Sequence, residues 1–370
     1  MLSKACIVGQ YQTKLTSLAA KPNLDLYVVV PPSWRDERGT IPLERKHTDG
    51  YTLSVAPIRF NGHFHLFYYP TLEKILARVQ PDILHIDEEP YNLATYHAAR
   101  TMHRLNSRAR ILFFSWQNIL RKYPPPFSWM EQRVYDYADA AIAGSSEAQW
   151  VLHRKGFKKP ISIIPQFGIP DSFVPNPAQR DEKHIIIGYA GRLVREKGIQ
   201  VLLRALAQVQ AEWQLKILGS GPLYASLEKL ARELNIASRV QFAAWVSSGD
   251  MPNFYNSLDI LVVPSLTQPN WKEQFGRVIM EAMACGVPVI GSNSGEIPHV
   301  LGDAGAVVPE GDVRALASVL TELIQNKTRR QGLGSTGRAR AQKLFSQQRV
   351  VDDTYALYEK LLHQTPGTVI

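Results

Sequence analysis

The chain has 370 residues, 45% hydrophobic and 20% charged, a composition typical of a globular protein and unlike that of disordered or fibrous chains. At about 150 residues per domain, this length predicts two domains. The net charge of +9 sits mainly in the first half, where residues 1–180 hold 22 basic against 15 acidic side chains.

Several classes of protein are excluded at this stage. No apolar run approaches the ~18 residues that a membrane-spanning helix needs, and the start does not have the form of a secretory signal. Two cysteines, Cys6 and Cys285, predict neither a disulfide framework nor a metal site. We therefore expect a cytoplasmic protein without a nucleic-acid partner. The basic first half fits either an ordinary solvated surface or peripheral contact with anionic lipid at the inner membrane face.

The first half alternates apolar runs with helical patterns. Strands are predicted at residues 4–8, 24–30, 51–58, 63–69, 81–86, 111–115, 138–143 and 161–164, with a long polar loop at 33–50. Helices are predicted after Pro70, from Pro90 to Arg104, and over residues 129–137 and 145–155. This alternation predicts a parallel sheet covered by helices on both faces.

An interdomain linker follows. Residues 168–183 contain three prolines and no periodicity, which is typical of a linker. We expect a first domain over residues 1–170, a linker over 171–183 and a second domain over 184–346.

The second half repeats the alternation more clearly. Strands are predicted at residues 184–190, 215–218, 240–244, 258–263, 287–290 and 305–308, and helices at 198–209, 223–234, 250–256, 313–324, 328–344 and 347–362. Glycine or polar residues follow four of these strands, at Gly191, Gly219–Gly221, Ser265 and Gly291–Asn293. Ligands of open α/β sheets bind beyond the carboxyl ends of the strands, so these exits predict a binding edge.

One stretch of this half carries unusual chemistry. Glu273 precedes a short amphipathic helix, and Glu281 lies about a turn and a half inside it. The N-terminus of a helix suits a phosphate group, because its first N–H groups lack partners and its dipole end is positive. Two carboxylates beside a phosphate indicate a ligand that also carries hydroxyls. That combination describes a nucleotide sugar.

A second motif supplies cations. Gly191-Arg192-Leu-Val-Arg-Glu-Lys197-Gly198 joins a buried strand to a helix and places Arg192 and Lys197 near the same edge. Arginine suits bidentate phosphate contacts, and lysine adds a point charge. Two cations and a helix N-terminus can neutralise a diphosphate without Mg²⁺. The histidines show no metal-ligand spacing, so we expect no metal and no cofactor besides the donor substrate.

The two motifs together, G-R-L-x-x-x-K-G at 191–198 and E-x7-E-A-M-A-C-G-V-P-V-I at 273–290, resemble the retaining nucleotide-sugar glycosyltransferases of family 4. The resemblance covers nearly all of residues 184–365, and the first half more loosely. It implies the GT-B architecture, two doubly wound, Rossmann-like parallel-sheet domains facing a cleft. It also implies that the last helix, about 347–363, returns to the first domain.

The resemblance also implies roles for residues, with Glu273, Arg192 and Lys197 as the catalytic ones. Arg192 and Lys197 would hold the donor diphosphate, Glu273 would contact the donor-sugar hydroxyls, and Glu281 would accept from the ribose. Further donor contacts are implied at Gln274, Phe275, Gly276, Trp245, Val246, Ser265 and Gly9.

Plainer interpretations stay open for four of these positions. Glu281 is alternatively a solvated helix carboxylate, and Glu273 a surface loop charge. Ser265 is alternatively a strand-end cap, and Trp245 a packing residue.

The first domain departs from the family pattern. Gln117 stands where a histidine near the reacting sugar is usual, and an amide cannot act as a base. Asp87 stands at another exit that is often histidine, and the turn at Gly9 lacks the usual glycine pair. Asp87 or Glu88 supplies an acceptor-side carboxylate, or else caps the helix that Pro90 opens.

We therefore expect a metal-independent, retaining hexosyltransferase that uses a UDP- or GDP-linked sugar and a glycolipid, polysaccharide or small-molecule acceptor. The alternatives are a sugar-nucleotide epimerase of the same fold and a non-catalytic nucleotide-sugar-binding module. The basic, aromatic loop at residues 121–129 contacts a lipid acceptor or membrane, or docks on its own domain.

Overall fold

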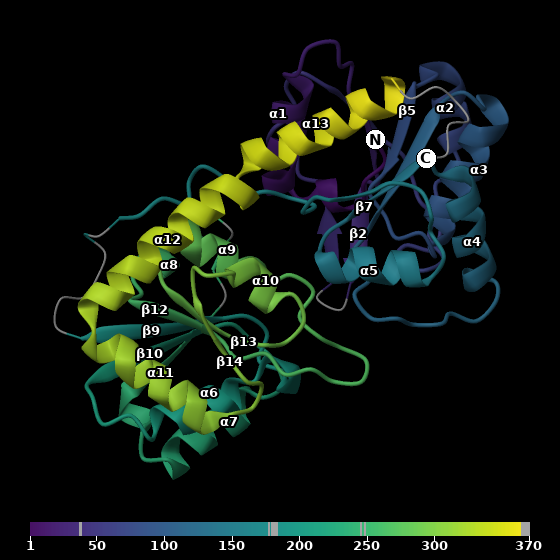
Figure 1. The fold of residues 1–370 in the computed structure, drawn as a ribbon. Coiled ribbons are helices and arrows are strands. Elements are labelled where there is room, and N and C mark those ends of the chain that lie inside the picture. The colour runs from purple at the N-terminus through teal and green to yellow at the C-terminus, as the bar shows by residue number, and fades with distance from the viewer. Residues whose placement is uncertain (37–38, 177, 179–183, 245, 248, 364–370) are drawn as a thin grey trace. The chain divides into compact units, whose positions relative to one another are not determined.

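The computed structural model describes residues 1–36, 39–176, 178, 184–244, 246–247 and 249–363 (Figure 1). The chain forms two compact α/β units. Unit 1 comprises Met1–Gly168 and the segment that begins at Gln347, and unit 2 comprises Ile169–Ser346. The expected linker at 171–183 lies partly outside the described residues.

Unit 2 is built on a parallel sheet in the order β11-β10-β9-β12-β13-β14. The strands are β9 (Ile185–Ala190), β10 (Trp213–Leu218), β11 (Val240–Ala243), β12 (Ile260–Val263), β13 (Val289–Ser292) and β14 (Ala306–Val308). The order reverses between β9 and β12, and in doubly wound folds the ligand crevice lies at such a reversal.

Helices cover both faces of this sheet (Figure 1). One face is covered by α6 (Ile199–Leu206), α7 (Tyr224–Glu233) and α11 (Val313–Gln325), and the other by α8 (Met251–Asn256), α9 (Arg277–Ala284), α10 (Ile297–Leu301) and α12 (Lys327–Phe345). Alternate residues of β9 serve the two cores: Ile187 and Tyr189 face one, and Ile186 and Ala190 the other. A strand buried on both faces explains the unbroken apolar run in the sequence.

The sheet of unit 1 is ordered like that of unit 2, but a single residue, Leu2, takes the place of the first strand. Its strands are β1 (Tyr27–Val30), β4 (Thr52–Val55), β5 (Ile83–Ile86), β6 (Arg110–Ser115), β7 (Ala140–Ala143) and β8 (Ile161–Ile163). Leu2 makes parallel bridges to both Val29 and Ile86, and so joins the β1-β4 pair to the β5-β6-β7-β8 sheet. A separate antiparallel pair is formed by β2 (Ser33–Asp36) and β3 (Gly39–Pro42).

Helices also cover both faces of the unit 1 sheet. One core lies beneath α2 (Leu72–Val79), α3 (Leu93–Leu105), α4 (Phe127–Tyr137) and α5 (Ser146–Arg154), and the other beneath α1 (Gln12–Ala19) and α13 (Gln347–His363). Figure 1 shows α13 running beside α1, and the two helices are in contact. The last helix therefore completes the core of unit 1.

The α/β fold with parallel sheets confirms the expected fold class, although several local predictions were wrong. Residues 4–8 are not a strand: pairing stops at Leu2, and Ala5–Ile7 turns as a 3-10 helix that buries Cys6 and Ile7. Residues 63–69 form a turn and one isolated bridge from Tyr68 to Arg59, and the polar loop at 33–50 contains the β2-β3 hairpin. Helices α1 and α10 were not predicted.

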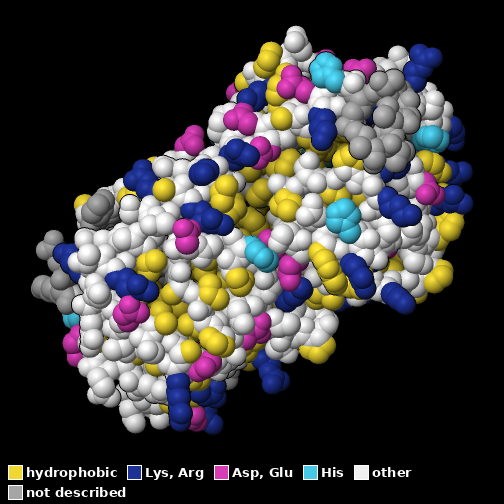
Figure 2. Space-filling view, in the orientation of Figure 1, with side chains coloured by type: hydrophobic (Ala, Val, Ile, Leu, Met, Phe, Trp, Pro, Cys, Tyr) yellow, Lys and Arg dark blue, Asp and Glu magenta, His cyan; other side chains and the backbone are white. Residues whose placement is uncertain are grey.

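Among the described residues, no helix is long and apolar enough to cross a bilayer. On the face shown in Figure 2, Lys and Arg side chains stand in separate small groups, so the net charge of +9 does not gather there in one continuous patch.

Candidate functional site

In unit 2 the two sequence motifs meet at the reversal of strand order. The turn after β9 approaches the exit of β12 so closely that a Cβ on Gly198 would lie 1.8 Å from the carbonyl oxygen of Pro264. Gly198 also has a φ of +68°, in the left-handed region that favours glycine. The glycine that ends the first motif thus lets Lys197 reach the strand exit at Ser265.

Lys197 and Glu273 are directly paired. The Lys197 ammonium lies 2.7 Å from Oε2 of Glu273, and the Ser265 hydroxyl donates to the same oxygen at 2.9 Å. The ammonium also lies 4.8 Å from the ring centroid of Trp271. Glu273 is only 8% exposed, so its interpretation as a surface loop charge was wrong. Ser265 is also more than a strand-end cap, since it holds this carboxylate.

Glu281 is a buried, double acceptor on α9. Its Oε1 accepts from Nε of Arg277 at 2.8 Å, and its Oε2 accepts from the Tyr255 hydroxyl at 2.8 Å. It is 6% exposed, so the solvated interpretation was wrong. Burial raises the pKa of Glu281, while the Arg277 charge and the hydrogen bonds from Tyr255 and Arg277 oppose that shift. A carboxylate has about four acceptor positions, so two bonds leave capacity for hydroxyl donors.

The start of α9 has the features of an anion site. Gly276 precedes the helix with a φ of +75° and makes no side-chain cap. A Cβ there would lie 2.7 Å from Cδ1 of Ile279, so only glycine fits without rearrangement. Gln274 is exposed, and the ring of Phe275 packs against Phe345 at 5.6 Å.

The other donor-side candidates are less central or lie elsewhere. Arg192 is exposed on the turn after β9, and its carbonyl accepts from the Tyr189 hydroxyl at 2.9 Å. Val246 is half-buried, whereas Trp245 lies outside the described residues. Gly9 belongs to unit 1, where its N–H donates to Glu44 at 2.9 Å.

Sequence reasoning missed several contacts at this edge. The Arg277–Glu281 pair could have been found from its four-residue spacing on a helix. Tyr255 comes from α8 and gave no local signal. The backbone of Glu273 is held from the loop after β13, because the Glu296 N–H donates to its carbonyl at 3.1 Å and Gly295 packs against it.

In unit 1 the equivalent reversal of strand order lies between Leu2 and β5. There the carboxylates of Asp87 and Glu88 bond the residues that follow Leu2. Oδ2 of Asp87 accepts from the Ser3 hydroxyl at 2.6 Å, and Oε1 of Glu88 accepts from the Lys4 N–H at 3.1 Å. Burial raises the pKa of Glu88 to about 7, partly offset by the Lys4 charge. No hydrogen bond joins Asp87 or Glu88 to the start of α3 among the described residues, so the capping interpretation was wrong.

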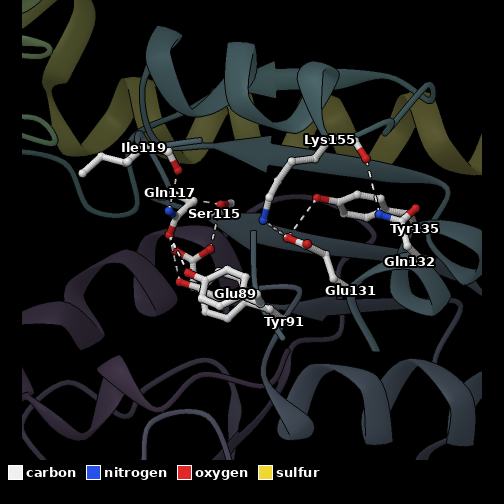
Figure 3. Close-up of polar contacts among 10 residues, drawn as sticks. Glu89, Tyr91, Ser115, Gln117, Ile119, Glu131, Gln132, Tyr135 and Lys155 are labelled. Carbon is white, nitrogen blue, oxygen red and sulfur yellow. Dashed lines mark hydrogen bonds and ion pairs between the residues drawn. The ribbon is translucent and has the colours of Figure 1, made fainter. Parts of the chain in front are cut away.

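Gln117 lies in a hydrogen-bond network at the exits of β5 and β6 (Figure 3). Glu89 accepts from the Ser115 hydroxyl and from the Trp116 N–H, both at 2.7 Å. The Ser115 hydroxyl in turn accepts from the N–H of Gln117 at 3.1 Å. Burial raises the pKa of Glu89 to about 7, while the two hydrogen bonds favour its ionised form. Glu89 was not singled out from the sequence.

The side-chain amide of Gln117 is fixed in orientation. Its Nε2 donates to the carbonyl of Ile119 at 2.6 Å, and its Oε1 accepts from the hydroxyls of Tyr123 and Tyr91 at 3.1 and 3.3 Å. Among the described residues, no group of three or more His, Cys, Asp or Glu side chains is arranged to hold a metal ion.

Two family profiles match the chain. The profile described as "Glycosyl transferases group 1" matches residues 172–340, and that described as "Glycosyltransferase Family 4" matches residues 12–167. The two matches correspond closely to the two units.

Two curated relatives show the same kind of similarity. The D-inositol 3-phosphate glycosyltransferase of Corynebacterium jeikeium is 31% identical over 62% of this chain and 59% of its own length. A GDP-mannose-dependent phosphatidylinositol monomannoside mannosyltransferase of Corynebacterium glutamicum is 36% identical over 44% of this chain and 43% of its own. The matched regions thus span less than two thirds of these relatives.

Solved structures share the fold. Sucrose-phosphate synthase from Thermosynechococcus elongatus superposes with a TM-score of 0.72 at 22% identity, over 95% of this chain and 93% of that one. The Anabaena protein HepE, in complex with UDP and glucose, gives 0.71 at 18% identity over 98% of both chains. At such identities the likeness extends to the GT-B fold alone.

Proposed function

This chain belongs to the glycosyltransferases of family 4, and we propose that it moves a hexose from a nucleoside diphosphate sugar to an acceptor hydroxyl with retention of configuration. The proposal is supported by the family membership and by the site in unit 2, where cation, carboxylates and helix N-terminus converge at the reversal of strand order.

The observation that carries the proposal is the Lys197–Glu273 pair. These residues are 76 positions apart in sequence and 2.7 Å apart in space. An ammonium has three N–H donors, so Lys197 can hold Glu273 and still donate to a phosphate oxygen. Glu273 would accept from donor-sugar hydroxyls beside that phosphate.

Glu281 would accept hydrogen bonds from the ribose hydroxyls. Its Arg277 and Tyr255 contacts fix the carboxylate from two sides, which pre-organises its remaining acceptor positions for a pair of hydroxyls. Gly276 brings the backbone at the start of α9 close to the diphosphate, with Gln274 and Phe275 beside it.

Charge on the leaving diphosphate would be neutralised by Arg192, Lys197 and the α9 N-terminus. Proposed in this way, the reaction is independent of metal. Transfer by wild-type protein would then keep its rate when excess EDTA is added, whereas a loss of rate that Mg²⁺ restores would contradict metal independence.

The donor is proposed to be UDP- or GDP-linked. HepE is described with UDP and glucose, and the mannosyltransferase relative is described as GDP-mannose-dependent. The relatives and neighbours give no support to an epimerase. They give no support to a non-catalytic module either, since the relatives are described as transferases.

A peripheral membrane contact through unit 1 is a further part of the proposal. Leu120 and Trp129 are 46% and 49% exposed and flank the basic residues Arg121 and Lys122. Aromatic and basic groups together suit an anionic lipid interface. Co-sedimentation with phosphatidylglycerol vesicles, but not with phosphatidylcholine vesicles, would support this contact, and equal recovery with both would oppose it.

A donor screen tests the donor site directly. Thermal unfolding is measured with UDP- and GDP-hexoses, since a ligand that binds the native state raises the midpoint. We expect Glu281→Ala to weaken nucleotide binding, and Glu273→Ala to lower turnover more than affinity. Wild-type kinetics in both variants would show that the donor site has been wrongly assigned.

A further inference from the structure

An aromatic cluster lies beside Gln117 in unit 1. The rings of Tyr91 and Tyr123 are 4.3 Å apart and tilted by 32°. His65, from the loop before α2, has its ring centroid 5.4 Å from Tyr91, 5.8 Å from Tyr123 and 5.2 Å from Phe127. Tyr91 is buried, whereas Tyr123, His65 and Phe127 are half-buried. Three of the four rings are therefore partly accessible to solvent at the carboxyl edge of the sheet.

Hydrogen bonds to Gln117 orient two rings of the cluster. The Gln117 amide, oriented by Ile119, accepts from both phenols and so sets the direction of the two hydroxyls. Figure 3 shows Gln117 beside Tyr91 and Glu89 at this edge. Each phenol O–H donates one bond to Gln117, and its oxygen retains acceptor capacity. Two rings thus carry oriented hydroxyls at their rims.

A buried ion pair lies beside the Tyr123 ring. The Lys155 ammonium lies 2.6 Å from Oε1 of Glu131 and 4.7 Å from the ring centroid of Tyr123. Both charged side chains are less than one-tenth exposed. Glu131 is the one acceptor that the described residues provide for the three N–H donors of this ammonium. The Lys155 ammonium therefore lies over one face of the Tyr123 ring.

The charges around the cluster do not favour an anion. Two carboxylates and two cations surround the cluster: Glu131 pairs with Lys155, and the charges of Glu89 and Arg121 act in opposite directions on the Tyr123 hydroxyl. Burial lowers the pKa of His65, a hydrogen bond with Asn92 opposes that shift, and the nearby Arg121 charge adds to it. Flat aromatic faces with oriented hydroxyls and balanced charges nearby suit an uncharged, amphipathic ligand.

We propose that Tyr91, Tyr123, His65 and Phe127 form the acceptor subsite, and that the acceptor presents an uncharged sugar ring to it. The apolar C–H face of a pyranose would lie on Tyr123, and its hydroxyls would bond the phenol rims. This inference rests on the proposed function, because it assigns the acceptor of that reaction. Gln117 is then a positioning residue that orients two tyrosines.

The test is saturation-transfer NMR on the full chain with methyl α-glucoside, methyl α-mannoside and methyl α-galactoside as probes. Glucose 6-phosphate is the anionic comparison. We expect transfer to the ring protons of at least one methyl hexoside, and weaker transfer to the phosphate ester. Tyr123→Ala should reduce the apparent affinity about fivefold, the scale of one aromatic contact. Tyr123→Phe, which keeps the ring, should retain most of it.

Trp150→Ala is the matched control, since Trp150 is 53% exposed on α5, outside the cluster. Unchanged thermal midpoints would show that the variants are folded. The inference is overturned if none of the methyl hexosides binds, if Tyr123→Ala binds as wild type does, or if glucose 6-phosphate binds more tightly.

Failure of the proposed function would be seen separately. Binding of UDP- and GDP-hexoses depends on unit 2, and is measured on the same preparations by calorimetry. Donor binding without hexoside binding would contradict the acceptor subsite and leave the proposed donor site intact. Hexoside binding without any donor binding would support a sugar-binding site and contradict the proposed transferase function.

Discussion

At the scale of single residues, the candidate site depends on partners that charge alone does not reveal. The motifs were enough to single out Lys197, Glu273 and Glu281 from the sequence. Their mutual geometry was not predictable, because Lys197 and Glu273 meet only through the close packing of two strand exits. The contact between Tyr255 and Glu281 was not predictable either, because the two residues lie far apart in sequence.

The Arg277–Glu281 pair gives a prediction at this scale. Arg277→Met leaves a buried carboxylate with one hydroxyl donor, so we expect the free energy of unfolding to fall by about 1–2 kcal/mol and nucleotide affinity to fall with it. Lys229→Met breaks an exposed pair of the same spacing with Glu233 and should change stability by less than about 0.5 kcal/mol. Urea unfolding of both variants measures the difference. Equal losses would contradict the importance assigned to burial.

Glu89 gives a prediction about pH. Burial raises its pKa from 4.5 to about 7 in the folded state. Its contribution to stability is therefore fully present below about pH 4.5 and is lost as pH rises through about 7. Relative to Glu89→Gln, which does not titrate, the wild-type thermal midpoint should fall by a few degrees between pH 5 and pH 8. A constant difference between the two proteins would show that Glu89 does not titrate in this range.

At the scale of elements, periodicity predicted most strands and helices because buried parallel strands and amphipathic helices have strong local patterns. It failed where tertiary contacts decide the conformation. The apolar run at residues 4–8 reads as a strand, yet the sheet needs only Leu2, and the rest turns to bury Cys6 and Ile7. The β2-β3 hairpin carries polar residues and gave no strand signal.

Gly198 tests how the first motif is placed. Gly198→Ala would put a Cβ against the Pro264 carbonyl at a left-handed φ, so we expect a loss of about 2 kcal/mol or more and weaker donor binding. Gly332→Ala is the matched control, because it lies inside α12 with open space around its Cβ. That change should stabilise the protein by about 0.5–1 kcal/mol. If both variants behaved alike in thermal unfolding and donor binding, the close approach at Gly198 would not matter.

At the scale of the whole molecule, both units share the strand order around a reversal that charged residues flank, and unit 1 adds one further strand, β8. The sequence predicted parallel sheets in both halves. It could not show that unit 1 builds its first strand from Leu2 alone, since a single bridging residue has no periodicity. The return of the last helix was implied by family resemblance, and α13 buries Val350, Val351 and Leu361 in unit 1.

Fragments test this division. A fragment of residues 169–346 should fold and bind nucleotide sugar, because its two cores are complete. Residues 1–168 alone should expose the apolar surface that α13 covers, whereas the same fragment joined to residues 347–363 should recover cooperative unfolding. Circular dichroism melts distinguish these cases. Cooperative unfolding of residues 1–168 alone would contradict the role given to α13.

The most direct test of the central claim is turnover with a panel of UDP- and GDP-hexoses in the presence of methyl hexosides. We expect release of free nucleoside diphosphate in step with an α-linked product, stimulated by acceptor and strongly reduced in Glu273→Ala. Epimerised donor without acceptor, or donor binding without any turnover, would contradict it.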